Sequence, residues 1–246
     1  MRIDFLGTGA GNYRGSRRQP CSALLDGVLL DCGAGATGRL HDLHRFDGVD
    51  AVLITHLHTD HVAGLFDLLL HTIITGRSRP LTILSPPGLR AILGSLFAAR
   101  STVVDPSERY DLRLLEGDRP EATVGRWAIR SVPLEHSVLD LGFELKADGL
   151  TVFYTGDTRE PCAAHTVRAD VLIHEATYPD HLADQARAFG HSTPSDAAAA
   201  AVAMRAGRLL INHVGDQADA ESEVLRAARA VFPETEVTED RTHFEL

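Results

Sequence analysis

Short apolar runs and longer amphipathic stretches alternate through most of the chain. The apolar runs predict buried strands, and the amphipathic stretches predict helices that cover a sheet. Strands are expected at residues 3–6, 22–25, 28–31, 51–54, 81–84, 112–115, 122–132, 141–146, 150–154, 171–173 and 209–211. Helices are expected at residues 36–45, 62–74, from 86–88 to about 100, 180–188, 193–206 and 219–231. The alternation predicts an α/β fold with mixed sheets inside and helices outside.

Two Asp-Gly pairs lie between expected strands. Asp26-Gly27 and Asp148-Gly149 are typical of tight hairpin turns, because both residue types tolerate the positive φ that these turns need. No linker rich in Gly, Pro or Ser divides the chain, and the alanine run 197–201 is expected to be a packing face of a helix. We therefore expect one domain that spans residues 1–246.

A cluster of polar residues follows the apolar run 51–54. His56 and His58 are two positions apart, so on an extended backbone their side chains point the same way. Asp60 and His61 come as the chain turns into the next helix and can face a second point. Three histidines scattered at a helix start would be the structural alternative, but this spacing at the end of a strand favours metal binding.

Three more potential ligands follow expected strands: His136, Asp157 and His213. Because unpaired buried charge is costly, three such placements favour ligands over core filling. Asp157 is the expected bridge, since one carboxylate can give one oxygen to each of two ions. The remaining residues divide into two sets: His56, His58 and His136 for the first ion, and Asp60, His61 and His213 for the second.

This ligand set predicts a dinuclear centre. Imidazole-rich sites with a few carboxylates suit Zn²⁺, and Mn²⁺ or Fe²⁺ would be tolerated by the same set. Two ions about 3.5–4 Å apart would hold a bridging hydroxide, with the pKa of the bound water lowered toward ~7.

Asp31 and the glycine loop 7–11 each have two interpretations. Asp31 leaves a buried strand and is expected to accept a hydrogen bond from a ligand histidine, although it could instead cap the helix at 36–45. The glycine loop could cradle a phosphate or form a plain tight turn. Arg14, Arg17 and Arg18 follow it and could contact a phosphate or lie in a solvated loop.

The ordered set of seven potential ligands resembles the metallo-β-lactamase fold over nearly the whole chain. This resemblance implies a four-layer αββα sandwich. Two further motifs, His174-Glu175-Ala176-Thr177 and Gly190-His191-Ser192-Thr193, resemble the late motifs of ribonuclease Z and its phosphodiesterase relatives. In that group the Glu and the second His pair, so that the imidazole protonates the leaving oxygen. The candidate catalytic residues are therefore Glu175 and His191, with Asp60 orienting the nucleophile; a buried structural pair is the alternative.

The chain departs from ribonuclease Z in two places. That enzyme usually carries a basic arm for tRNA between the strands expected at 141–146 and 150–154, where this chain has only Asp148-Gly149. After the last ligand, ribonuclease Z has a Ser and an Arg-Tyr pair, and this chain has Val214-Gly215-Asp216-Gln217. The stretches 18–22 and 134–137 are instead similar to cyclic-phosphate phosphodiesterases of phosphonate breakdown, without their zinc-binding cysteines.

The net charge, the cysteines and the apolar runs indicate which partners and which cellular compartment are expected. The net charge of -10 argues against a nucleic-acid footprint over the whole surface. Cys21, Cys32 and Cys162 are odd in number and far apart, which predicts reduced, buried thiols. No apolar run suits a signal peptide or a membrane span, so a cytoplasmic protein without a membrane partner is expected.

Three functions are carried forward as hypotheses. The first is a phosphodiesterase that acts on a small or cyclic phosphodiester through the bridging hydroxide. The second is a tRNA 3′-end endonuclease of the ribonuclease Z type, with RNA as partner. The third is a metal-containing nucleotide-binding protein without turnover. Thioester or lactam hydrolysis fits the late motifs less well. The resemblance also implies a homodimer.

Overall fold

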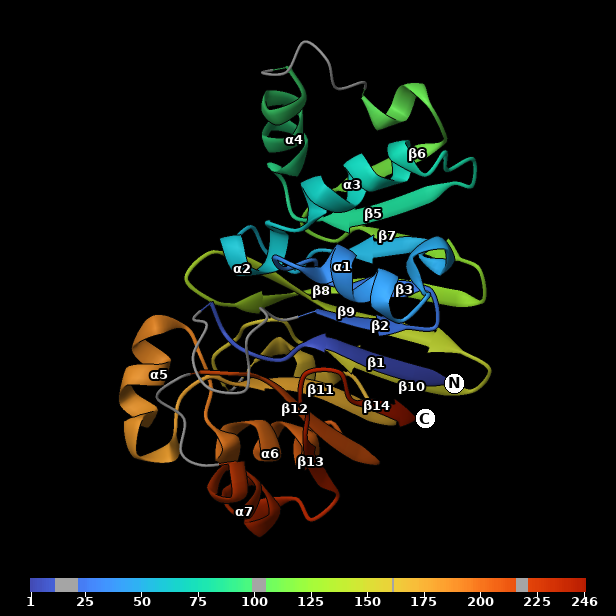
Figure 1. The fold of residues 1–246 in the computed structure, drawn as a ribbon. Coiled ribbons are helices and arrows are strands. Elements are labelled where there is room, and N and C mark those ends of the chain that lie inside the picture. The colour runs from blue at the N-terminus through green and yellow to red at the C-terminus, as the bar shows by residue number, and fades with distance from the viewer. Residues whose placement is uncertain (12–21, 99–104, 161, 216–220) are drawn as a thin grey trace.

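Two seven-stranded sheets face each other in the computed structural model, which describes residues 1–11, 22–98, 105–160, 162–215 and 221–246 (Figure 1). The first sheet has the order β14-β1-β2-β3-β4-β5-β6, with β1 (Arg2–Gly7), β2 (Ser22–Leu25), β3 (Val28–Leu30), β4 (Ala51–Leu53), β5 (Leu81–Ser85), β6 (Leu112–Glu116) and β14 (His243–Glu245). The second has the order β13-β12-β11-β10-β9-β8-β7, with β7 (Glu121–Val124), β8 (Trp127–Glu135), β9 (Leu139–Ala147), β10 (Leu150–Tyr154), β11 (Val171–Ala176), β12 (Arg208–Val214) and β13 (Thr235–Val237). Both sheets mix parallel and antiparallel pairs.

Helices cover the outer face of each sheet (Figure 1). The first sheet carries α1 (Ala36–Asp42), α3 (Leu65–Ile74) and α4 (Leu89–Ala98), and the second carries α6 (Pro194–Ala203) and α7 (Glu221–Val231). Two short helices, α2 (Thr59–Val62) and α5 (Ala183–Phe189), lie on the same side of the sandwich. Four 3₁₀ turns lie within the described ranges: η1 (Phe46–Gly48), η2 (Pro106–Glu108), η3 (Ala163–Thr166) and η4 (Asp180–Leu182). The expected four-layer αββα sandwich is confirmed.

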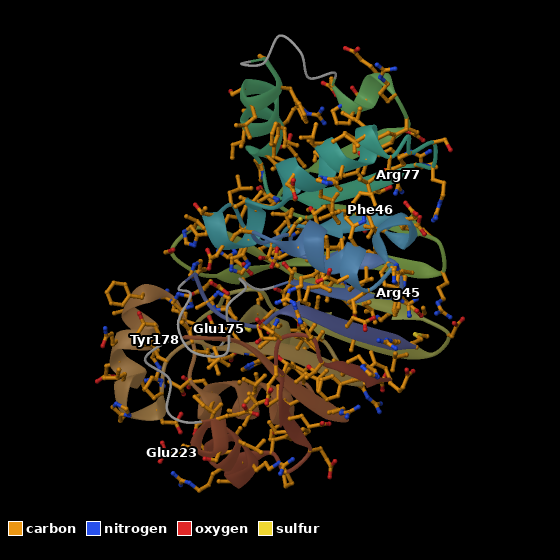
Figure 2. The ribbon with its side chains drawn as sticks, in the orientation of Figure 1. Arg45, Phe46, Arg77, Glu175, Tyr178 and Glu223 are labelled. Carbon is orange, nitrogen blue, oxygen red and sulfur yellow. The ribbon has the colours of Figure 1, made fainter. Side chains whose placement is uncertain are left out.

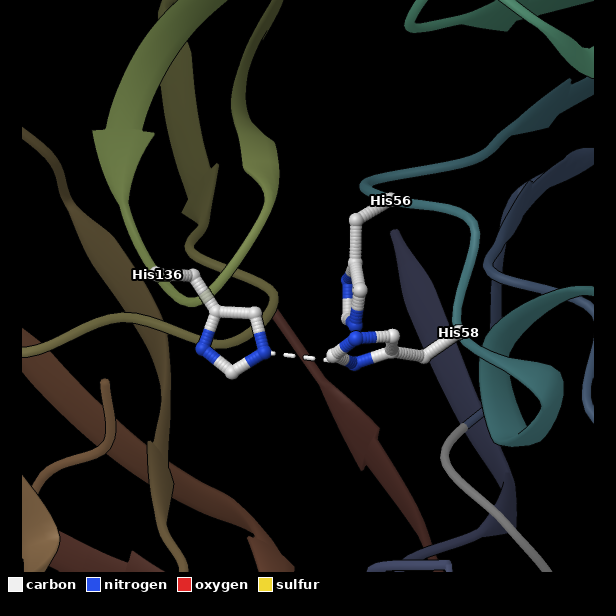
Figure 3. A group of neighbouring side chains, drawn as sticks. All are labelled: His56, His58 and His136. Carbon is white, nitrogen blue, oxygen red and sulfur yellow. Dashed lines mark hydrogen bonds between the residues drawn. The ribbon is translucent and has the colours of Figure 1, made fainter. Parts of the chain in front are cut away.

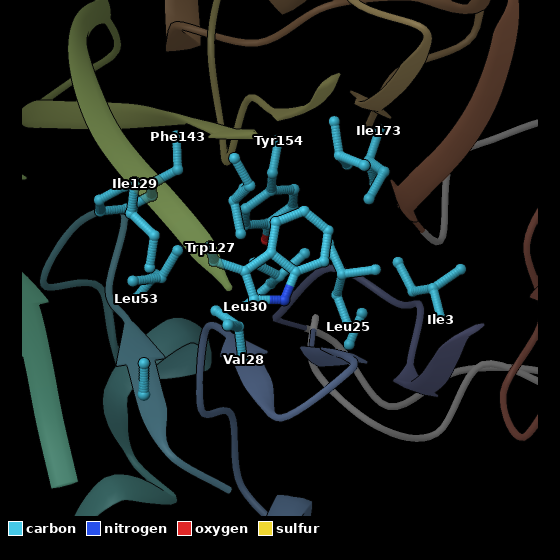
Figure 4. Packing of buried hydrophobic residues seen from close by; sticks show 14 of the residues in the cluster. Ile3, Leu25, Val28, Leu30, Leu53, Trp127, Ile129, Phe143, Tyr154 and Ile173 are labelled. Carbon is cyan, nitrogen blue, oxygen red and sulfur yellow. The ribbon is translucent and has the colours of Figure 1, made fainter. Parts of the chain in front are cut away.

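Three apolar clusters hold the layers together. Trp127, Phe143 and Ile3 belong to the cluster between the two sheets (Figure 4). Phe46 belongs to the cluster beneath the helices of the first sheet (Figure 2). On the second sheet, the alanine run of α6 is largely buried, which confirms the predicted packing face. Small side chains let this helix approach the strands closely, and burial of apolar area is the main stabilising contribution in all three clusters.

The structure corrects several sequence-based boundaries. The strand expected at 122–132 is a hairpin of β7 and β8, because Gly125 adopts φ 56° and turns the chain. The helix expected at 62–74 is divided into α2 and α3. The terminal strands β13 and β14 were not predicted, since three-residue strands carry little periodicity. The alternative in which Asp31 caps the helix is wrong, because Gly35 occupies the N-cap position of α1.

The two predicted Asp-Gly turns are present. Asp148 and Gly149 adopt φ 51° and 84°, and Ala147 pairs with Leu150 across the turn, so β9 and β10 are joined by two residues alone. Among the described residues, no helix has the length and apolarity to cross a membrane. Cys32 is buried as expected, whereas Cys162 is partly exposed. The expectations for Arg14, Arg17, Arg18, Cys21, Asp216 and Gln217 lie outside the described residues.

Candidate metal centre

Three histidines from both sheets converge at one end of the sandwich (Figure 3). His56 and His58 follow β4 of the first sheet, and His136 follows β8 of the second. Nε2 of His136 lies 3.3 Å from Nδ1 of His58, and the rings of His56 and His136 are 4.9 Å apart. Each residue has a nitrogen within 4.8 Å of the other two. This spacing suits coordination of one cation, in which Zn–N distances are about 2.0–2.1 Å.

A second group lies beside the first. It contains Asp60 and His61 of α2 and His213 of β12, and their ligand atoms are also within 4.8 Å of one another. Nε2 of His61 is 3.2 Å from Nε2 of His213, which is 3.4 Å from Oδ2 of Asp60. His213 adopts φ 49°, a strained conformation for a non-glycine residue, and such strain clusters at functional sites.

Asp157 lies between the two groups. Its Oδ2 is 3.9 Å from Nε2 of His56, 3.5 Å from Nε2 of His61 and 3.3 Å from Nε2 of His213. Although burial opposes ionisation, the charges of His213 and His61 hold the pKa of Asp157 well below its usual value. The carboxylate is therefore ionised at neutral pH and faces both groups.

Two atoms of this cluster are buried without a hydrogen-bond partner among the described residues: Nε2 of His56 and Oδ1 of Asp157. An unpaired buried polar atom costs about 1–3 kcal/mol, so a native structure rarely leaves one unsatisfied without reason. Both atoms are strong metal ligands and both belong to the centre. The donor set therefore fits divalent cations.

Asp31 orients His61 as the sequence predicted. Oδ2 of Asp31 accepts a hydrogen bond of 2.8 Å from Nδ1 of His61 and one of 2.6 Å from the hydroxyl of Tyr154. Oδ1 accepts from the backbone N of Thr55 at 2.8 Å. With Nδ1 committed to a carboxylate, His61 presents Nε2 to the centre, an arrangement that is common among metal-binding histidines.

Three other histidines, His56, His136 and His213, also have partners at Nδ1, and these partners were not predicted from the sequence. His136 donates to the backbone oxygen of Gly190 at 2.7 Å. Nδ1 of His56 lies 3.0 Å from Oδ1 of buried Asp140. Asp140 stands beside apolar residues at the start of β9, and a carboxylate in an apolar strand was the signal that could have found it.

His213 is connected to the Glu175 carboxylate through Thr177. Nδ1 of His213 lies 2.8 Å from the Thr177 hydroxyl, which donates to Oε2 of Glu175 at 2.6 Å. Because the hydroxyl proton is committed to Glu175, its oxygen accepts from His213. Thr177 thus links His213, a potential metal ligand, to the carboxylate of Glu175.

The second feature is the pair formed by Glu175 and His191. Glu175 is buried in β11, and His191 precedes α6. Oε1 of Glu175 lies 2.9 Å from Nδ1 of His191, whose ring is 4.8 Å from that of His136. Burial disfavours the imidazolium, but the Glu175 charge and hydrogen bond outweigh it and raise the pKa of His191 to about 9. The His191 side chain is therefore protonated at neutral pH and lies beside the centre.

Glycines allow the loops to approach this closely. Gly156 adopts φ 62°, and a Cβ there would lie 2.6 Å from Cβ of Thr55. Gly190 adopts φ 79°, and a Cβ there would lie 2.9 Å from Nδ1 of His136. Larger residues at either position would force apart the segments that carry Asp157, His56 and His136.

The glycine loop 7–11 packs against the centre, and Gly9 pairs with Val214 of β12 in a parallel bridge. The backbone N–H groups of Thr8 and Ala10 donate to Asp240 and Val214, so they are committed to protein acceptors. A Cβ on Gly11 would lie 3.1 Å from Oδ2 of Asp60. These contacts argue against the phosphate cradle, and the loop pairs with β12 rather than forming the tight turn.

An aromatic pair lies on the His191 side of the centre. The ring of Tyr178 is 5.8 Å from that of His191 and stacks with Phe189 at 6.4 Å (Figure 2 labels Tyr178 and Glu175). Phe189 is 56% exposed, so an apolar ring faces solvent on the His191 side of the centre. Such rings stack with nucleobases.

The αββα sandwich and this site define a metal-dependent hydrolase of the metallo-β-lactamase fold. The family model described as "Beta-lactamase superfamily domain" matches residues 27–214, and the chain belongs to this family. It is 32% identical to "Ribonuclease Z" of Shouchella clausii, over all of this chain and 97% of that protein. The alignment runs over 305 positions against 246 residues here, so the relative contains additional residues within the shared region.

Solved structures agree with this assignment. The short form of human tRNase Z is 25% identical with a TM-score of 0.83, covering 100% of this chain and 99% of that one. A diphosphatase described as a member of the PhnP family is 18% identical with a TM-score of 0.75, covering 100% of this chain and 97% of that one; this likeness concerns the fold alone.

Proposed function

We propose that this chain hydrolyses phosphodiester bonds at a centre of two divalent cations, with the 3′ end of a precursor tRNA as the first substrate to test. The arrangement that carries the proposal is Asp157 between two ligand groups with the Glu175–His191 pair alongside. The relatives named ribonuclease Z and the human tRNase Z favour RNA over the small-phosphodiester hypothesis.

The proposed ligand sets are those expected from the sequence. His56, His58 and His136 would hold one cation, Asp60, His61 and His213 the other, and Asp157 would contact both. Zn²⁺ suits this imidazole-rich set best, with Mn²⁺ or Fe²⁺ as alternatives. When bound, the cations would activate a water molecule and offset the negative charge of the phosphoryl group.

The protein's own residues would position the substrate and move the proton. The charges of His213 and His61 keep Asp157 ionised despite its burial, and Asp60 would orient the nucleophile as well as bind a cation. Nδ1 of His191 is held by Glu175, which leaves Nε2 to donate a proton to the leaving oxygen. The stacked surface of Tyr178 and Phe189 lies on this leaving-group side, where a nucleobase could pack.

A small or cyclic phosphodiester is the second candidate substrate. The observation that favours it is the two-residue turn between β9 and β10, at the position where the sequence comparison placed a tRNA-binding arm. The 305-position alignment agrees with a segment present in the relative and lacking here.

A direct comparison of substrates tests the proposal. The purified chain is loaded with Zn²⁺ or Mn²⁺ and assayed on a precursor tRNA with a 3′ trailer, on a 2′,3′-cyclic nucleotide and on bis-p-nitrophenyl phosphate. Cleavage that chelation abolishes and metal restores is the expected result, and accurate cleavage of the precursor supports the first substrate. Full activity of Asp157→Ala, or tight nucleotide binding without turnover on any of these compounds, would overturn the proposal.

A further inference from the structure

A second cluster of potential metal ligands is connected to Glu175 through His174. It is built from the carboxylate of Glu160, the thiol of Cys162 and the imidazole of His165. One donor atom of each lies within 4.8 Å of the other two. None of the three belongs to the seven-residue set described above. The cluster occupies the segment that leads from Asp157 to η3, so it lies next to the proposed centre in sequence but uses different side chains.

Glu160 is buried and held in one orientation by His174. Oε1 of Glu160 lies 3.1 Å from Nε2 of His174, whose Nδ1 donates to the backbone oxygen of Glu175 at 2.7 Å. Oε2 accepts a hydrogen bond of 3.1 Å from the backbone N of Cys162. A buried carboxylate fixed by outer hydrogen bonds, with one oxygen aimed at further donors, is how proteins support metal-binding carboxylates.

His165 supplies the second observation. Its Nε2 lies 2.5 Å from Oε2 of Glu160, yet this atom is buried and makes no hydrogen bond of acceptable geometry within the described chain. A nitrogen that is buried without a hydrogen bond needs a partner that the described residues do not supply. A cation held by both groups would separate them to the spacing of two ligands and would use this nitrogen.

The thiol of Cys162 completes the donor set. Burial, followed by the nearby Glu160 charge, raises the pKa of Cys162, so the thiol stays protonated without a cation. A divalent cation would displace this proton and offset two anionic groups at once. Thiolate and imidazole ligands select Zn²⁺ and similar ions over Mg²⁺ or Ca²⁺.

We propose that Glu160, Cys162 and His165 form an additional binding site for a thiol-binding divalent cation such as Zn²⁺. Cys162 and His165 lie at the start of η3, and Glu160 is tied to β11 through His174, so a bound ion would hold η3 and Glu160 against the second sheet. The role is structural: it would hold the segment that presents Asp157.

Cobalt substitution distinguishes this site from the hydrolytic centre. The centre offers nitrogen and oxygen ligands only, so a thiolate-to-Co²⁺ charge-transfer band in the near ultraviolet can arise only from a cysteine. We expect this band in the Co²⁺-loaded wild type and in the control variant Cys32→Ser, and its loss in Cys162→Ser. Metal analysis of the Zn²⁺-loaded chain should show about one ion per chain fewer in Cys162→Ser and in His165→Ala than in the wild type.

The readout does not require activity, so failure of the proposed hydrolysis would leave the test intact. Circular dichroism confirms that each variant is folded before its metal content is compared. Absence of a thiolate band in the wild type, or an unchanged band and ion count in Cys162→Ser, would show that the cluster is an ordinary hydrogen-bonded network and would overturn the inference.

Discussion

Oε1 of Glu175 lies 2.9 Å from Nδ1 of His191, and this hydrogen bond joins a buried carboxylate to a partly exposed imidazole. The remaining acceptor positions of Glu175 are occupied by Thr158, Thr177 and the backbone N of Ser192. The carboxylate therefore has no freedom to turn away. His191 is fixed through Nδ1, and its other nitrogen remains available to a substrate.

Loss of His191 is expected to remove most of the activity without removing the metals. A general acid contributes about 10²–10⁴-fold to rate, so His191→Ala should lower kcat by that order on a natural phosphodiester. Glu175→Gln should lower it less, and the double variant should be no slower than His191→Ala, because both act through one proton. Steady-state kinetics and metal analysis check this; effects that multiply would contradict a shared role.

The pH profile should report the same pair. His191 can donate only while protonated, and its raised pKa of about 9 means that the protonated form is present at neutral pH and is lost as pH rises through this value. Activity should therefore fall on the alkaline side, and Glu175→Gln should move this fall to lower pH. Bis-p-nitrophenyl phosphate, whose leaving group needs little protonation, provides the control. An alkaline limb that Glu175→Gln does not move would count against the assignment.

Asp157→Asn should disrupt metal binding. The substitution removes the carboxylate charge that lies between the two ligand groups, so we expect loss of bound metal and of nearly all hydrolysis. Asp148→Asn, in the exposed β9–β10 turn, is the matched control and should retain both. Metal analysis after gel filtration measures the difference, and a fully metallated Asp157→Asn chain would refute the bridging role.

Asp31→Asn tests the support beneath His61. Replacement of such an outer partner typically weakens metal affinity or activity by about 10–100-fold, because the imidazole loses its orientation and part of its basicity. Competition with a chelator measures the affinity. Asp26→Asn in the β2–β3 turn makes the same chemical change away from the centre and should have no such effect. Equal affinities for the two variants would contradict the prediction.

Gly11→Ala should impair the site while preserving the fold. The added Cβ would lie 3.1 Å from Oδ2 of Asp60 and would push this side chain from its position. Gly38→Ala is the control, since a Cβ there meets nothing within 4 Å and should stabilise α1 by about 0.5–1 kcal/mol. Activity measured alongside thermal unfolding separates the two outcomes; a fully active Gly11→Ala would show that Asp60 needs no fixed position.

The pattern of apolar and polar residues predicted the site best where potential ligands directly follow a buried strand. The run 51–54 predicted a buried strand, and β4 occupies Ala51–Leu53, so the position of His56 and His58 followed from the sequence. The Asp31–His61 hydrogen bond was anticipated for the same reason, because an acid leaving a buried strand needs a partner. The terminal strand β14 was not predicted, because it pairs with β1, whose residues are more than 230 positions away in the sequence.

The sequence by itself determined which side chains reach the ends of buried strands, because alternation of apolar and polar residues is a local property. Only the tertiary structure decided that Asp140 lies against His56, that Thr177 connects His213 to Glu175, and that Glu160 meets His174. These contacts depend on how two sheets stack and how loops close over them. Such distances arise from packing of the whole core, which no short stretch of sequence encodes.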